Sequence, residues 1–245
     1  MKRYLHILIP FILLFSLFLP LICFQINDSL FQPDHIAWDS SNSFQSDIPL
    51  IANLYSNHYR SISQENSKSY DLTNLEENQK EILPIKNQFT TQINALLDQQ
   101  LLFPSYMGQI EDTFVVSFGN LSIFYSEAPY LYTLNQIFYL DGDTCRSIDY
   151  TMDANTNKII SCTIYIPEQI AITDEERTQF LQNYIQYLEL NELIDWTNNS
   201  ECMESYQGKV QVYMDISSFA NQYQLTFGIV PLGLHASNNY TISRS

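Results

Sequence analysis

The chain has 245 residues and a formal net charge of −16 at pH 7, with 27 acidic against 11 basic residues. This charge repels nucleic acid and anionic lipid headgroups, so we expect no nucleic-acid partner. Hydrophobic residues make up 45% and aromatic residues 14% of the chain, which excludes global disorder and predicts a sizeable folded core.

An apolar run occupies the N-terminus. Lys2 and Arg3 precede residues 4–24, a nearly uninterrupted apolar stretch that is long enough to cross a hydrocarbon core of about 30 Å. Its end lacks the small residues of a signal-peptide cleavage site, which favours an uncleaved signal-anchor transmembrane helix over residues 1–24. Secretion after cleavage is the alternative, and a lipoprotein signal at Cys23 is disfavoured because a large residue precedes that cysteine.

The charges around this run predict its orientation. After Lys2 and Arg3 the next basic residue is Arg60, and the positive-inside rule counts basic residues close to a span. We therefore expect a single-pass cell-membrane protein with a cytoplasmic N-terminus and an extracytoplasmic C-terminal part. The abundance of Asn, Gln, Ser, Tyr and Ile suggests a bacterial protein from an AT-rich genome.

Residues 25–80 are polar and rich in Ser, Asn, Gln and Asp, which predicts a juxtamembrane stalk. One short helix is expected within it. Residues 46–59 carry a helix-start signal at Ser46 or Asp47, place Pro49 in the first turn and align apolar residues on one face.

The folded domain is predicted over residues 81–245, and it opens with a helix. Apolar residues over 84–103 recur at helical spacing, and Pro104 ends the pattern. Short strands are expected to follow at 113–118, 121–125, 132–140 and 145–152.

The segment 158–166 alternates apolar and polar side chains, which predicts a strand with one buried face. Pairing Asp153 with Lys158 across the preceding turn gives a hairpin and sets Cys162 opposite Asp149. Cys162 belongs to the inward-facing series of this strand, where a small apolar side chain is expected.

Three cysteines follow the apolar run, in a compartment that permits disulfides. In the hairpin register above, Cys145 lies about 13 Å along the strand from Cys162, which is too far for a disulfide. Any disulfide must then include Cys202, unless all three thiols are reduced.

A second helix is expected to begin at Thr173, which forms a capping box with Glu176 and precedes apolar residues at helical spacing. Alternating segments at 210–216 and 223–229 predict a C-terminal hairpin. The order of helix, strands, helix and hairpin predicts an α+β fold, in which an antiparallel sheet has two main amphipathic helices packed on one face.

Tyrosines are concentrated in the middle of the chain. Tyr125, Tyr130, Tyr132 and Tyr139 lie close together in sequence. Aromatic side chains suit binding surfaces because they bury a large area and keep a polar tip, but they suit sheets equally well. We therefore predict these four tyrosines as candidate binding residues, with structural packing as the alternative.

One segment offers oxygen ligands at the spacing of a calcium loop. Asp153, Asn155 and Asn157 occupy positions 1, 3 and 5 of such a loop. Position 6 is Lys158 where glycine is needed, and position 12 is Ile164 where a bidentate Glu is needed. We interpret the segment as a hairpin turn, keep it as a weak metal candidate, and expect no cofactor.

Acidic residues supply the remaining candidate for catalysis. Asp141, Asp143 and Asp149 could provide the two carboxylates that a hydrolase of sugar chains needs, although Asp-Gly-Asp between strands is first a turn signal. The sequence contains no H-E-x-x-H, G-x-S-x-G or S-x-x-K motif and no phosphate-binding glycine loop.

Residues 150–161, followed by the capped helix, carry a strand, an Asp-containing turn and a second strand. This stretch resembles the hairpin with a D-x-x-T-G-K-[IV] turn of PepSY-like domains and similar anchored accessory proteins of Gram-positive bacteria. Asn157 stands where that turn usually has glycine. The resemblance implies a regulatory or inhibitory extracytoplasmic module and assigns no functional residue.

These observations predict a membrane-anchored, non-enzymatic binding, sensor or regulatory module with a protein partner in the membrane or cell envelope. The alternatives are an envelope hydrolase that uses acidic residues and a structural envelope protein.

Overall fold

The computed structural model describes residues 46–58, 67–72, 79–105, 115–125, 128–140, 143–167, 169–199, 201–219 and 222–233. The predicted transmembrane segment 1–24 lies outside these residues. Within them, no helix combines the length and the apolar character needed to cross a membrane.

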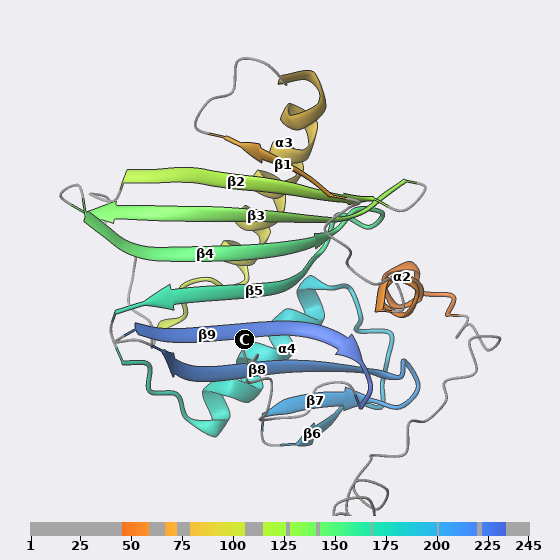
Figure 1. Cartoon of the computed structure of the whole chain (residues 1–245). Coiled ribbons are helices and arrows are strands. Elements are labelled where there is room, and N and C mark those ends of the chain that lie inside the picture. The colour runs from red at the N-terminus through yellow and green to blue at the C-terminus, as the bar shows by residue number, and fades with distance from the viewer. Residues whose placement is uncertain are drawn as a thin grey trace, which may run out of the picture. The chain divides into compact units, whose positions relative to one another are not determined.

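The described residues form a nine-stranded sheet in which every neighbouring pair is antiparallel (Figure 1). The strands lie in the order β1-β2-β3-β4-β5-β9-β8-β7-β6. Their bounds are Ser67–Asp71 (β1), Val115–Tyr125 (β2), Pro129–Leu140 (β3), Asp143–Asp153 (β4), Ile159–Ile166 (β5), Thr197–Asn199 (β6), Cys202–Ser205 (β7), Val210–Phe219 (β8) and Gln222–Pro231 (β9). The C-terminal hairpin thus pairs with β5 and completes one continuous sheet.

Three helices accompany the sheet: α2 (Pro49–His58), α3 (Gln79–Asp98) and α4 (Asp174–Tyr187). Helices α3 and α4 lie behind the sheet in Figure 1, and α2 lies at one end of it. Two hydrogen bonds join α4 to the α3 region, from Tyr187 Oη to Gln92 Oε1 at 2.8 Å and from Asn183 Nδ2 to the Gln99 carbonyl at 3.2 Å. The fold is therefore α+β, as expected.

The face of the sheet beneath α3 and α4 is the apolar core, and we call it the covered face. Directly opposed residues of neighbouring strands share a face, so the register defines rows of side chains that cross the sheet. One such row is buried along its whole length and consists of Leu121, Leu134, Tyr150, Cys162, Phe227 and Met214. This row is the centre of the core.

The opposite face carries polar side chains at the intervening positions, and we call it the polar face. Two of its rows run through Ser122, Thr133, Thr151 and Ser161, and through Asn135, Asp149, Thr163, Thr226 and Asp215. These side chains are half-buried or exposed. Neither α3 nor α4 covers this face, so the alternation along much of these strands reflects one side in the core and one side without these helices.

Helix α2 and strand β1 fall in the range predicted as a stalk, yet both belong to the folded domain. Leu50, Ile51, Leu54 and Tyr55 of α2 are buried in the core, and the Tyr55 hydroxyl donates to the Lys209 carbonyl at 2.6 Å. Strand β1 pairs with β2 along its full length. The helix itself was predicted, but local polarity hid β1 and hid the fact that α2 belongs to the folded domain.

The hairpin of β4 and β5 forms as predicted, but its register is shifted by one residue. Asp153 and Lys158 pair across the turn as predicted, since the Asp153 N–H donates to the Lys158 carbonyl at 2.9 Å. A bulge next to Met152 then sets Cys162 opposite Tyr150, so the predicted pairing of Cys162 with Asp149 is wrong. The bulge keeps the apolar residues of both strands on the covered face.

Strand β2 is one strand with an irregularity where the sequence predicts two. Its pairing with β3 shifts between Phe118 and Leu121, on either side of Gly119. A Cβ atom at Gly119 would lie 2.7 Å from Asn135 Oδ1, so a side chain there would displace the Asn135 amide. The Gly-Asn signal therefore marks a bulge, not a turn.

Both long helices end in the same way. Helix α3 is followed by Gln100 at φ 57°, with Leu101 N–H donating to the Leu96 carbonyl, and α4 is followed by Glu189 at φ 60°. Such left-handed residues close the last helical turn. Helix α3 begins at Gln79, earlier than predicted from Pro84, which lies inside it.

Cys162 and Cys202 are free and buried. Cys162 lies on the covered face, whereas Cys202 is directly opposite Tyr213 in a row of the polar face. Three strand spacings, about 14 Å, separate β5 from β7, so these two thiols cannot form a disulfide.

Candidate functional site

The polar face is a surface of the sheet over which neither α3 nor α4 lies (Figure 1). Its side chains bond laterally to one another: Ser122 Oγ donates to Ser69 Oγ at 3.2 Å, and Thr163 Oγ1 lies 3.3 Å from Thr226 Oγ1. Gln224 Nε2 also donates to Thr226 Oγ1 at 3.1 Å. These bonds orient the hydroxyl and amide groups relative to one another along the surface.

A carboxylate stands in the middle of this face. Asp149 is exposed and accepts a hydrogen bond from Asn135 Nδ2 at 2.7 Å. Burial, followed by the charge of Asp149, raises the pKa of the Tyr165 hydroxyl, for which Asp149 is also the hydrogen-bond acceptor. Asp215 lies in the same row, two strands beyond Thr163.

No basic side chain of the described residues lies in the rows of the polar face. Lys68 faces the covered side at β1, Arg146 faces it at β4, and the others belong to helices or turns: Lys80, Lys86, Lys158, Arg177 and Lys209. The electrostatic character of the polar face is therefore negative, which favours ligands that carry hydrogen-bond donors or positive charge.

The four predicted tyrosines do not form one cluster. Tyr130 and Tyr132 are buried on the covered side, whereas Tyr139 lies seven residues further along β3, on the other face and about 23 Å away. Tyr125 lies at the edge of the sheet next to β1. The structure therefore does not unite these residues in one groove.

Tyr125 belongs instead to a small polar cluster at that edge. Glu81 of α3 accepts hydrogen bonds from Tyr125 Oη at 3.1 Å and from Tyr70 Oη at 3.2 Å. Lys68 Nζ lies 3.8 Å from the same carboxylate and 5.4 Å from the centre of the Tyr125 ring. Burial and the Glu81 carboxylate raise the pKa of Tyr125, so its hydroxyl stays protonated as a donor.

The predicted turn at 153–158 contains a buried carboxylate. Asp153 is 1% exposed, whereas Asn155 is exposed and Asn157 adopts φ 56°. Among the described residues, no group of three or more His, Cys, Asp or Glu side chains is arranged to hold a metal ion. A metal at this turn would have to rely on amide oxygens beside the single carboxylate.

Among the described residues, the acidic side chains considered for hydrolysis do not form a pair of facing carboxylates. Asp141 lies outside the described residues, and Asp149 is bonded to Asn135 on an open sheet surface. A glycosidase needs two carboxyl groups at a defined separation across a substrate.

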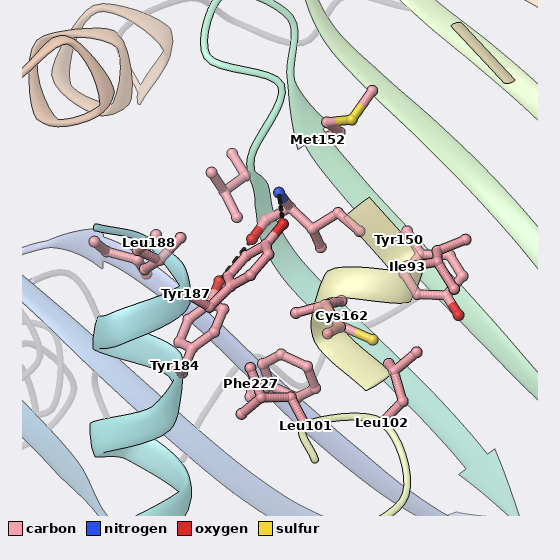
Figure 2. Close-up of a cluster of buried hydrophobic side chains, with 14 of the residues drawn as sticks. Ile93, Leu101, Leu102, Tyr150, Met152, Cys162, Tyr184, Tyr187, Leu188 and Phe227 are labelled. Atoms are coloured by element: carbon pink, nitrogen blue, oxygen red, sulfur yellow. Dashed lines mark hydrogen bonds between the residues drawn. The ribbon is translucent and has the colours of Figure 1, made fainter. Parts of the chain in front are cut away.

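The Cys162 thiol and the Tyr184 and Tyr187 hydroxyls lie within the core (Figure 2). Cys162 lies fully buried near Tyr184 and Phe227, and burial raises the pKa of its thiol well above the usual range. The Tyr184 hydroxyl donates to the Ile159 carbonyl at 3.0 Å, and the Tyr187 hydroxyl accepts from the Ile159 N–H at 2.8 Å. These groups serve packing, because a protonated, inaccessible thiol is inert.

Sequence reasoning missed Glu81 and Asn53, which bond to residues distant in the chain. Neither stands in a motif, so no local signal identified them. The polar rows, in contrast, follow at β5 from the alternation of Ser161 and Thr163 with Cys162 and Ile164, and they could have been identified in advance.

The chain matches no protein-family model, and no curated protein or solved structure is detectably similar to it.

Proposed function

We propose that this protein is a membrane-anchored extracytoplasmic binding or regulatory module without catalytic activity, and that it binds its partner through the polar face. The observation that carries the proposal is the sheet itself, which packs one face into the apolar core and has neither α3 nor α4 over the other. A preorganised, negatively charged surface on a rigid sheet is suited to recognition.

The chemistry of the polar face indicates the kind of partner. Its hydroxyl and amide groups, the Asp149 carboxylate and the Tyr165 ring match a polar surface rich in hydrogen-bond donors. The apolar N-terminal run supports a site of action at the membrane, where the partner is a membrane or envelope protein. The resemblance of residues 150–161 to PepSY-like domains supports a regulatory role.

The location is tested first. We expect the full chain, expressed in a Gram-positive host, to sediment with membranes and to resist extraction by high salt or carbonate. Protease added to protoplasts should degrade the domain from outside. Recovery of the intact protein in the culture medium or in the cytosol would contradict the anchored arrangement.

The partner is tested by crosslinking in the native membrane, followed by affinity purification. We expect one stoichiometric membrane or envelope protein to copurify with the wild-type chain. Asp149→Lys reverses the charge at the centre of the polar face and should abolish the recovery of that protein. Glu192→Lys makes the same charge change at an exposed position between α4 and β6 and should preserve it. Equal recovery with both variants would contradict the proposal that the partner binds through the polar face.

A further inference from the structure

Asp149 is the centre of a group of side chains on three neighbouring strands of the polar face. Asn135 of β3 lies directly opposite Asp149 and donates from Nδ2 to Asp149 Oδ1 at 2.7 Å. On β5, Thr163 lies opposite Asp149, so Tyr165, two residues further on, is a diagonal neighbour within reach of an aromatic side chain. The Tyr165 hydroxyl donates to the Asp149 carboxylate. Hydrogen bonds therefore hold Asn135, Asp149 and Tyr165 together.

The Asp149 carboxylate keeps acceptor capacity that these two donors do not use. A carboxylate offers about four lone-pair sites, and both of its donors here are neutral. The ion pairs among the described residues, Lys68 with Glu81 and Lys158 with Glu189, do not involve it. Asp149 is exposed, and exposed aspartates are ionised at neutral pH. A negatively charged acceptor therefore faces water without a described cation beside it.

Tyr165 places an aromatic ring next to this carboxylate. Its side chain is half-buried, and its neighbours in the same row are Ser147 on β4 and Gln224 on β9. The face of an aromatic ring attracts a cation that lies within about 6 Å of its centre. A carboxylate and an aromatic ring side by side therefore favour an organic cation, which can bond to the first and stack on the second.

Helix α2 contacts the polar face away from this group. Its Asn53 Nδ2 donates to the Asp153 carboxylate at 3.1 Å, at the end of β4. Asp153 lies four residues from Asp149, which corresponds to about 13 Å along the strand. Asp149 remains exposed, so a partner can reach its carboxylate.

We propose that Asp149 and Tyr165 bind the guanidinium group of an arginine side chain on the partner protein. This inference rests on the proposed function, because the partner and the polar face are those proposed there. A guanidinium is planar and carries several N–H donors, so it can pair with a carboxylate and stack on an aromatic ring. The ammonium group of lysine is a compact, strongly hydrated point charge, which suits this site less well. No basic side chain of the described residues lies in the rows of the polar face to compete for the carboxylate.

The test uses the full chain in a mild detergent, with N-acetylarginine amide as the probe. N-acetylcitrulline amide has nearly the same shape without the charge and is the matched control. Heteronuclear NMR spectroscopy detects weak binding and locates it on the sheet. We expect saturable shifts of the resonances around Asp149 and Tyr165 with the arginine probe, and weaker binding as the salt concentration rises. The citrulline probe should bind about tenfold more weakly or not at all.

Variants separate the contributions of the charge and the ring. Asp149→Asn should weaken binding of the arginine probe by about tenfold or more, because it removes the charge. Tyr165→Leu should weaken it by about two- to fivefold, because the ring face is lost, whereas Tyr165→Phe keeps the ring and should bind nearly as the wild type does. Glu192→Gln, which removes an exposed charge between α4 and β6, should have no effect.

The inference is overturned if the arginine probe causes no saturable shifts around Asp149, if the citrulline probe binds equally well, or if Asp149→Asn binds as tightly as the wild type. Equal binding of the citrulline probe would indicate a site for neutral polar ligands such as sugars. Loss of the copurifying protein with Asp149→Lys, without binding of the arginine probe, would overturn this inference and leave the proposed function standing. Probe binding with equal partner recovery from Asp149→Lys and Glu192→Lys would instead contradict the proposed partner interface and leave the cation site standing.

Discussion

The two faces of one sheet follow opposite physical rules. On the covered face, side chains such as Phe227 and Tyr150 are excluded from water and contact α3 or α4, so each atom contributes to stability. On the polar face, Thr226 and Asp149 keep access to water and bond to their neighbours. The difference teaches that adjacent residues of the same strand have separate roles, the first in holding the fold together and the second in forming the surface at which the proposed partner would bind.

The largest effect is expected from Phe227→Ala. Phe227 is fully buried and packs edge-to-face against Phe180 and Tyr184, with ring centres 5.0 and 5.1 Å away. Its truncation leaves a cavity between β9 and α4 and should lower the free energy of unfolding by about 3–5 kcal/mol. Urea denaturation measures this change.

The matched control is Thr226→Ala, one residue earlier on the same strand but on the polar face. We expect it to lower the free energy of unfolding by less than about 1 kcal/mol, because water replaces the lost hydroxyl bonds. Similar losses for the two variants would contradict the division into a covered and a polar face.

A smaller effect is expected from Tyr187→Phe. The Tyr187 hydroxyl accepts from the buried Ile159 N–H and donates to Gln92 Oε1, both at 2.8 Å. Its removal leaves a buried N–H without a partner and should lower the free energy of unfolding by about 1–3 kcal/mol. Tyr165→Phe on the polar face removes a half-exposed hydroxyl and should change stability by much less, so a larger loss there would reverse the comparison.

The covered face should also make the protein sensitive to alkaline pH. Burial raises the pKa of the Cys162 thiol, and it likewise raises the pKa of the Tyr150 and Tyr184 hydroxyls. In the unfolded chain these groups lose their protons near pH 8.5 and pH 10, about their ordinary values, while the native protein retains them. The contribution of these groups to the free energy of unfolding is therefore complete below about pH 8.5 and is lost as the pH rises further.

Urea midpoints measured from pH 7 to pH 10.5 test this dependence. We expect the wild type to lose stability progressively above about pH 8.5. Cys162→Ala should be less stable at neutral pH but should lose less stability between pH 8 and pH 9.5. Parallel curves for the two proteins would show that the Cys162 thiol ionises as readily in the native state as in the unfolded state.

The smallest effect is expected from Asn135→Ala. Asn135 bonds Asp149 at the surface of the polar face, so its loss should change the free energy of unfolding by no more than about 0.5 kcal/mol. The same variant should weaken recovery of the copurifying partner, because Asp149 is no longer held in place. A stability loss above 1 kcal/mol, with normal partner recovery, would make this residue structural.

Several elements were predictable because their signals are local. The capping box of Thr173 and Glu176 forms as expected, with the Thr173 hydroxyl accepting from Glu176 N–H at 3.2 Å. The alternation over 158–166 corresponds to β5, and the helix expected at 46–59 corresponds to α2. In each case the pattern repeats within a few residues, so neighbouring side chains alone encode it.

Other features depended on contacts between distant segments. Strand β1 has five residues with only a weak pattern, and it exists because β2 supplies its hydrogen-bond partners. The bulge at Met152 shifts the predicted register by one residue, which only the packing of both strands against the core could decide. The four candidate tyrosines were close in sequence, yet alternation along β3 separated Tyr132 from Tyr139.

The sequence by itself determined the α+β class, the antiparallel character of the sheet and the strongly acidic charge, because composition and short-range periodicity carry that information. Only the tertiary structure decided that β5 pairs with β9, that α2 and β1 join the core, and that Asp153 is buried against Asn53. The physical reason is that strand neighbours and buried polar contacts depend on which distant surfaces meet, and no local pattern records that choice.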